Sequence, residues 1–113
     1  KVSCAVDCGI AVSPDVIKAQ MEGGIGYSLG HAMRDEITLT EGVVDQSNFP
    51  DYEPLRIGGI GANKVHIWAS AELPSGVGEP GTPPSAPALA NAIAQAGPRV
   101  TELPMAAHGV AFA

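Results

Sequence analysis

One acidic side chain lies where a loop rich in glycine and proline would hold it in place. Glu79 stands between Gly78 and Pro80, within the proline- and glycine-rich stretch 74–87. A carboxylate on a rigid loop can be positioned with little loss of order when a substrate binds, which suits a general base. A solvated loop acid is the commoner case for such spacing, so both interpretations stay open at this point.

Gln20 is a second polar candidate, because it precedes a glycine-rich part of a predicted helix. This helix carries Gly23, Gly24, Gly26 and Gly30. Each glycine inside a helix costs about 1 kcal/mol relative to alanine, so the four together cost roughly 3–4 kcal/mol. Close packing of another backbone or close approach of a ligand would offset this cost. Gln20 could hydrogen-bond such a ligand, although a polar residue here is more often only part of the surface.

The histidine and cysteine spacings predict neither a metal centre nor a disulfide. His31, His66 and His108 are far apart in the sequence, so no metal site built from side chains of this chain alone is expected. Cys4 and Cys8 fall on one face of a predicted strand, about 13 Å apart at the usual rise per residue. A disulfide requires Cα atoms within about 7 Å, so we expect two free, buried thiols.

Several other functional classes are disfavoured. The stretch 24–30 does not match a nucleotide-binding glycine motif and lies inside a helix instead of opening one. The stretch 75–80 does not match the nucleophile elbow of a serine hydrolase. Six scattered basic residues and a net charge of −6 provide no electrostatic footprint for nucleic acid. No apolar run approaches the length of a membrane span.

The local patterns predict an α+β fold. Alternating polarity predicts the first strand, and Ser13-Pro14 followed by apolar residues at intervals of four predicts a long helix. The residues between the hairpin and the last strand, 47–61, are expected to be loop. The expected elements are, in chain order, a strand at 2–7, a helix at 14–34, a hairpin at 36–46, a strand at 65–69 and a helix at 85–96. Segregated strands and helices favour a small mixed or antiparallel sheet packed by two helices.

The composition indicates a piece of something larger. The 113 residues suit a single domain spanning 1–113. Charged residues make up 16% of the chain, against about 25% in a typical soluble domain, and glycine and proline number 14 and 10. The chain opens at Lys1 without an initiator methionine, so a fragment or a processed chain is expected.

Two separate motifs resemble the C-terminal part of the molybdenum-binding subunit of the xanthine dehydrogenase and aldehyde oxidase family. The first is Asp7–Ile17 followed by Gln20–Gly26. The second is Gly76–Gly81, which resembles the active-site loop of this family, followed by the helical stretch 84–93. The order of residues is most similar to the isoquinoline 1-oxidoreductase β-subunit branch, and the resemblance covers about residues 1–105.

The resemblance implies a hydroxylase that oxidises a carbon of an N-heteroaromatic ring or an aldehyde, with water supplying the oxygen. Carried over residue by residue, Glu79 would be the general base of the Gly-Glu-Pro motif. Gln20 would hydrogen-bond the pterin cofactor, and Gly23, Gly24 and Gly78 would let that cofactor approach the backbone. The implied cofactor is molybdenum bound to molybdopterin cytosine dinucleotide, which would do the redox chemistry while the protein supplies position and a base.

The resemblance also implies partners: the remaining segments of the molybdenum-binding subunit and a small [2Fe-2S] subunit. The isolated chain is therefore expected to be inactive and to hold no molybdenum. The alternative is a non-catalytic orphan or truncated module that forms homo-oligomers through an exposed apolar face. Both a cytoplasmic and a periplasmic location are compatible with the sequence.

Overall fold

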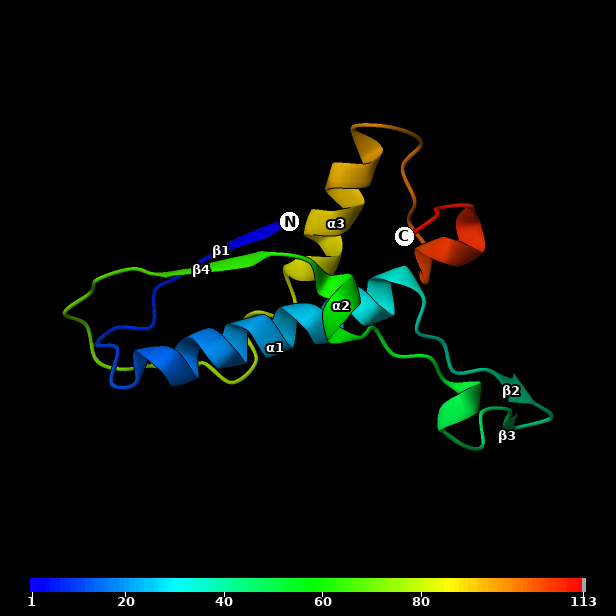
Figure 1. Ribbon diagram of the computed structural model, residues 1–113, viewed down its shortest axis with the longest axis horizontal. Coiled ribbons are helices and arrows are strands. Elements are labelled where there is room, and N and C mark those ends of the chain that lie inside the picture. Colours follow the sequence, from blue (N-terminus) through cyan, green and yellow to red (C-terminus); the bar gives the residue numbers. More distant parts are fainter. Residues whose placement is uncertain (113) are drawn as a thin grey trace.

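The computed structural model describes residues 1–112 and contains two helices, a helical turn and four short strands (Figure 1). The elements are, in order, β1 (Val2–Val6), α1 (Pro14–Met33), β2 (Leu39–Thr40), β3 (Val43–Val44), α2 (Ile57–Ile60), β4 (Asn63–Ile67) and α3 (Ser85–Ala94). Two 3-10 turns complete the chain, at Phe49–Asp51 and Met105–His108.

Helix α1 is the central element and agrees closely with the sequence prediction. Pro14 occupies the first turn, and the backbone carbonyl of Ser13 accepts the first helical hydrogen bond, from Ile17 N–H at 3.0 Å. Ser13 makes no side-chain cap, so proline and the backbone alone define the start. The predicted apolar stripe is confirmed, since all five of its members are buried: Ile17, Met21, Ile25, Leu29 and Met33.

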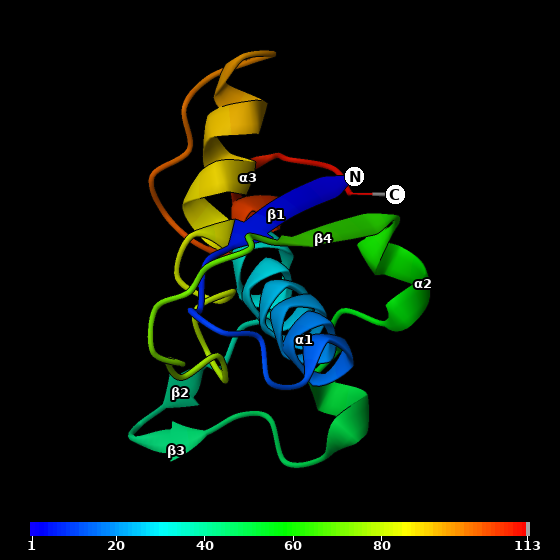
Figure 2. The ribbon, with the colours of Figure 1, turned by 90° about the vertical axis from the view of Figure 1, so that its left-hand side faces the viewer.

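The strands are divided between two sheets of two strands each. β1 and β4 pair in parallel, with Val2 opposite Asn63 and Val6 opposite Ile67. One face of this pair lies over α1, and α3 rises on the side of β1 (Figure 2). β2 and β3 form the predicted hairpin, whose turn residues Glu41 and Gly42 have φ angles of 52° and 82°. The α+β class is therefore confirmed.

The stretch 47–61 is not entirely loop, because Ile57–Ile60 forms the helical turn α2. The glycines within it indicate a loop from local chemistry alone. In the fold, however, Ile60 packs against Gly26 of α1, where a Cβ would lie 2.8 Å from Ile60 Cδ1. This tertiary contact overrides the local preference.

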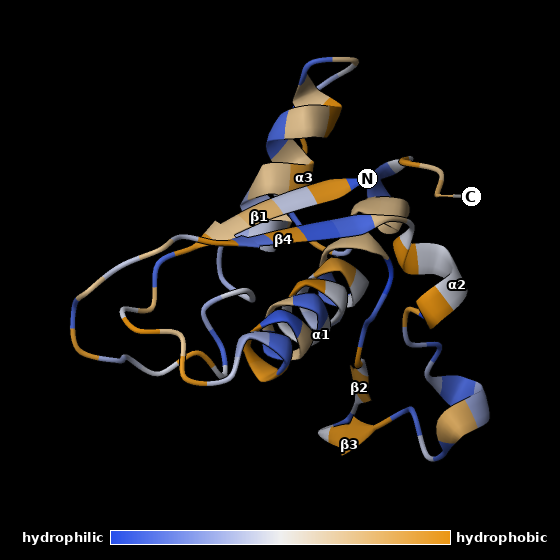
Figure 3. Cartoon of the chain, turned by 60° about the vertical axis from the view of Figure 1, so that its left-hand side comes forward, coloured by the Kyte–Doolittle hydropathy of each residue, from blue (hydrophilic) through white to orange (hydrophobic). Residues whose placement is uncertain are grey.

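The core is small and only partly closed. Ile25, Leu29 and Met33 form its centre, with partly buried Val2, Cys4 and Leu89 packed against them. Cys4 and Cys8 are both free thiols, and Cys8 alone is fully buried. Large apolar side chains remain exposed, among them Val12, Phe49, Ile57 and Leu73. Figure 3 shows apolar stretches of the chain at β3 and α2, away from the centre of the fold. Within residues 1–112, no helix combines the length and apolar character needed to cross a membrane.

Candidate functional site

The fold brings the two candidate motifs into contact. A Cβ atom added to Gly78 would lie 3.6 Å from Nε2 of Gln20, so the Gln20 amide sits directly beside the loop that carries Glu79. Gly81 is buried against the backbone of α1, where its missing Cβ would lie 3.0 Å from the Met21 carbonyl oxygen. Residues far apart in the sequence therefore form one surface.

The loop is fixed in place by a network of short hydrogen bonds. The Thr82 N–H donates to the Glu79 carbonyl at 2.9 Å, which closes a turn with Pro80 at its second position. The Ser85 hydroxyl donates to the Gly81 carbonyl at 2.7 Å, which ties the loop to the first turn of α3. The backbone of Glu79 is therefore held between α1 and α3.

The other end of the loop is tied to the residues that follow β1. Ile10 N–H donates to the Glu72 carbonyl at 3.0 Å, and Ser75 N–H donates to the Cys8 carbonyl at 2.9 Å. Gly9 makes this approach possible, because it has a φ of +71° and its missing Cβ would lie 2.7 Å from the Glu72 oxygen. The Glu79 loop is thus anchored at both ends.

The structure accounts for three of the four glycines in α1 by packing within the chain. A Cβ at each of these three positions would meet a side chain of another segment. These contacts are Gly24 with Thr82, Gly26 with Ile60, and Gly30 with Asp35. Gly23 is different, because apart from its own neighbourhood in the helix no atom of the described residues lies within 4 Å of its Cβ position. Gly23 lies about one helical turn from Gln20, so it leaves open space on the same face of α1 that carries Gln20.

Glu79 and Gln20 are both exposed in the described part of the chain. Any burial of the Glu79 carboxylate must therefore come from groups outside residues 1–112. The donors and acceptors at this surface are an amide, a carboxylate and backbone groups, a set suited to hydrogen-bonding an organic molecule.

The histidines do not converge. His31 Nδ1 lies 3.0 Å from the Tyr27 carbonyl oxygen, His66 packs edge-on against Trp68, and His108 Nε2 lies 3.7 Å from a Glu102 carboxylate oxygen. In the part of the chain that the structure describes, no three side chains of the types His, Cys, Asp and Glu are grouped as metal ligands would be.

Sequence reasoning did not identify the residues that hold the site together: Thr82, Ser85, Gly81 and Gly9. Two of them carried a usable signal. Thr82 and Ser85 are hydroxyl residues between a Gly-Glu-Pro turn and a helix, positions where such side chains commonly bond to nearby backbone. Nothing local indicates that Gly81 packs against α1 or that Gly9 packs against the loop.

Comparison with known proteins relates this chain to a family of molybdopterin-binding domains. A family model described as a molybdopterin cofactor-binding domain matches residues 1–60. The beta chain of the isoquinoline 1-oxidoreductase of Brevundimonas diminuta is 39% identical over 106 residues, which span 93% of this chain and 14% of that protein. A membrane-bound aldehyde dehydrogenase [pyrroloquinoline-quinone] of Gluconacetobacter polyoxogenes is 36% identical over 106 residues, with the same shares of 93% and 14%.

A solved structure shares the fold. The Cu,Mo-CO dehydrogenase in its carbon monoxide reduced state superposes with a TM-score of 0.69 at 25% identity, over 79% of this chain and 12% of that chain. The chain thus spans about one seventh of the curated relatives it matches. An alignment covering 93% of 113 residues must include both Gln20 and Glu79, so the similarity extends over both motifs.

Proposed function

The chain belongs to the molybdopterin cofactor-binding domain of the xanthine dehydrogenase family, and we propose that it supplies one wall of a molybdenum hydroxylase active site. The whole enzyme would oxidise a carbon of an N-heteroaromatic compound or an aldehyde, with water as the source of oxygen. The observation that carries this proposal is the position of the Gln20 amide, which lies 3.6 Å from where a Cβ on Gly78 would be and therefore beside the loop of the candidate base.

The residues at this contact fit a flat, polar organic cofactor. The Gln20 amide both donates and accepts hydrogen bonds, and the open space over Gly23 lets a ligand reach the helix backbone. Among the described residues other than its two chain neighbours, the Gln20 amide alone lies within 4 Å of the Cβ position of Gly78, so Gly78 too leaves room for close approach. The Cβ position of Gly24 is taken up by Thr82, so Gly24 would contribute backbone only.

The molybdenum cofactor, in the proposed cytosine dinucleotide form, supplies the redox chemistry when bound. Gln20 would bind and orient the pterin, with Gly23, Gly24 and Gly78 alongside. The Glu79 carboxylate would accept a proton from the attacking water, and the turn closed by the hydrogen bond from Thr82 N–H keeps the Glu79 backbone in place for this task. The low-dielectric surroundings that a general base requires come from the other segments of the subunit.

This role requires partners, because one wall does not make an active site. We propose that residues 1–113 form a single module that packs against the remaining segments of the molybdenum-binding subunit. A small [2Fe-2S] subunit would be the partner that takes up the electrons. Two relatives support a multi-subunit enzyme, since their names describe them as single subunits of an isoquinoline 1-oxidoreductase and of a nicotinate dehydrogenase.

The test is Glu79→Gln in the complete enzyme. We expect turnover to fall by about 10²–10⁴-fold, the usual contribution of a general base, while molybdenum content stays nearly unchanged. Glu72→Gln is the matched control, because Glu72 is also an exposed acid near the start of the same loop. Its backbone carbonyl, which accepts the hydrogen bond from Ile10 N–H, is not changed by this substitution. Turnover within tenfold of the unmodified enzyme for Glu79→Gln would show that Glu79 is not the base.

A further inference from the structure

β1 has an unpaired edge. In the parallel pair with β4, Val2 N–H donates to the Ala62 carbonyl at 3.2 Å, and the Val6 carbonyl accepts from Trp68 N–H at 2.8 Å. Backbone groups alternate in direction along a strand, so those of Val2 and Val6 point to β4, and those of Ser3 and Ala5 point away from it. Ser3 and Ala5 therefore present N–H and C=O groups that β4 does not satisfy.

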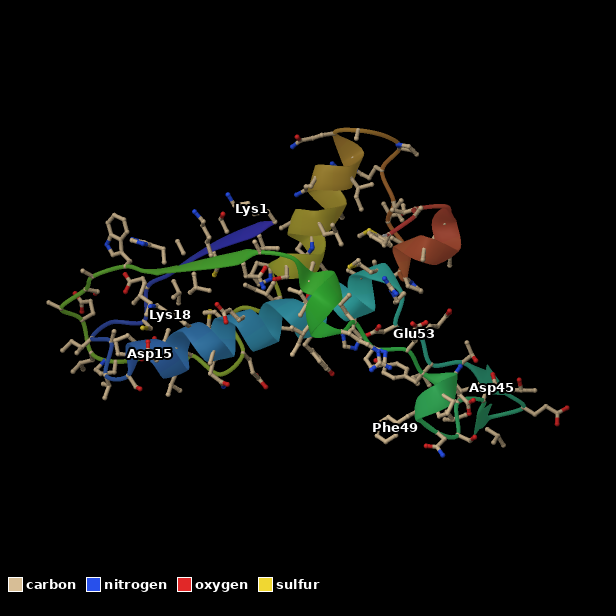
Figure 4. The ribbon with its side chains drawn as sticks, in the orientation of Figure 1. Lys1, Asp15, Lys18, Asp45, Phe49 and Glu53 are labelled. Carbon is tan, nitrogen blue, oxygen red and sulfur yellow. The ribbon has the colours of Figure 1, made fainter. Side chains whose placement is uncertain are left out.

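This edge opens into an apolar groove of about 540 Å³. Its floor is the core stripe of α1, and α3 forms the wall opposite β1. The residues that line it from these helices are Ile25, Leu29, Met33, Ser85, Ala88, Leu89 and Ala92. Lys1, which precedes β1 next to α3, is the one charged residue lining the groove within the described part of the chain (Figure 4).

The shape and chemistry of the groove suit an extended strand. A free strand edge offers backbone hydrogen bonds at the 3.3 Å spacing of a strand, which a helix cannot use because its own backbone groups are already paired. The α3 wall carries Ser85, Ala88 and Ala92, whose small side chains leave room for a backbone. A sheet of only two strands is also marginally stable by itself. Parallel strands are normally buried within larger sheets, so a further strand beside β1 would be the usual arrangement.

A second copy of this chain does not fit the groove equally well. Pairing two β1 edges would require them to approach within about 4.8 Å, while α3 stands beside each edge. A single extended segment enters such a groove, whereas a folded copy would bring its own α3 into collision. The source of the segment is suggested by length, because about six sevenths of the relatives lie outside the part that this chain matches.

We propose that an extended, largely apolar segment of the molybdenum-binding subunit, from outside these 113 residues, lies between β1 and α3 and pairs with the backbone of Ser3 and Ala5. The added strand widens the sheet and covers Ile25, Leu29 and Met33. This inference rests on the proposed packing of the module against the remaining segments of the subunit, but it requires neither the base Glu79 nor the cofactor contact of Gln20.

The first experiment is site-specific photo-cross-linking in the complete enzyme. Benzoylphenylalanine replaces Ala88, which lines the groove, or Asn91, an exposed residue of α3 that does not line it. Position 88 is expected to cross-link to one short segment outside this chain, at least tenfold more than position 91 does. Cross-links from position 88 to a second copy, to the iron–sulfur subunit or to no segment above the Asn91 control would overturn the proposal.

The second experiment needs no substitution, so it stands even where a bulky residue at position 88 blocks the groove. Hydrogen exchange of the complete enzyme should show the Ser3 and Ala5 amides slowed by at least 100-fold relative to an unstructured peptide, because both would be hydrogen-bonded. Exchange at the unprotected rate at either amide overturns the proposal, whatever the cross-linking shows. Neither cross-linking nor hydrogen exchange depends on turnover. The Glu79→Gln test of the general base and the tests of the added strand can therefore give opposite outcomes, and each proposal can be refuted without the other.

Discussion

Replacing Gly9 by alanine tests how the Glu79 loop is anchored. Gly9 has a φ of +71°, a conformation that is unfavourable for any residue with a Cβ. An added Cβ would also collide with the Leu73 carbonyl oxygen and would lie 2.7 Å from that of Glu72. Both are backbone atoms of a segment held on either side, by the hydrogen bond from Ile10 N–H to the Glu72 carbonyl and by that from Ser75 N–H to the Cys8 carbonyl, so neither can move aside cheaply.

Two other glycines separate the cost of the left-handed backbone conformation from the cost of the collision with the loop. Gly42 has a φ of +82° with no atom near its Cβ position, so Gly42→Ala should cost only the left-handed penalty of about 1–2 kcal/mol. Gly76 has neither restriction, so Gly76→Ala should be neutral or should stabilise by about 0.4–1 kcal/mol. Gly9→Ala adds overpacking of about 1–3 kcal/mol to the left-handed penalty, which brings its cost to about 2–5 kcal/mol.

The assay is urea denaturation of the chain followed by circular dichroism, with the three variants compared under the same conditions. The difference in the free energy of unfolding between Gly9→Ala and Gly42→Ala isolates the collision with the loop. If these two variants unfold within about 0.5 kcal/mol of each other, which is the usual scatter for surface substitutions, the loop does not pack against Gly9 and the anchoring argument is wrong.

Three further predictions concern the hairpin, the hydrogen bond between Tyr52 and Asp35, and the cofactor. The Thr38 hydroxyl donates to Asp45 at 2.6 Å and lowers the pKa of that carboxyl below its usual 3.8; Thr38→Val should raise it again in an NMR pH titration, with Asp51 unchanged. The carboxyl of Asp45 has a lower pKa in the folded chain than in the unfolded chain. The hydrogen bond therefore stabilises the hairpin fully at pH values above the unfolded-state pKa, and this stabilisation is lost as the pH falls through the folded-state pKa. Burial, then the hydrogen bond to Asp35 at 3.1 Å, raises the pKa of Tyr52; Asp35→Asn should return it part of the way toward 10.0 in an ultraviolet titration, and an unchanged value would contradict the contact. Elemental analysis of the purified 113-residue chain should find no stoichiometric molybdenum, and finding it would show that one wall suffices.

Much of the fold was predictable because its signals are local. The helix predicted at 14–34 is α1 at Pro14–Met33, since a proline at the first turn and a four-residue apolar spacing act within the segment itself. The hairpin was found for the same reason, as Glu41-Gly42 accepts the positive φ angles that its turn requires. Boundaries set by partners were less accurate: β4 runs over Asn63–Ile67, two residues earlier than predicted, because its limits follow its register with β1.

By itself the sequence determined the main elements, the excluded functional classes and the two motifs that resemble a molybdenum hydroxylase. These depend on periodicity, turn chemistry and residue order, which act over a few positions. The tertiary structure alone decided that Gly78 lies beside Gln20, that Gly24 serves packing while Gly23 stays open, and that β1 keeps a free edge. Such features depend on which distant segments pack together, and packing is settled by the shape of the whole chain.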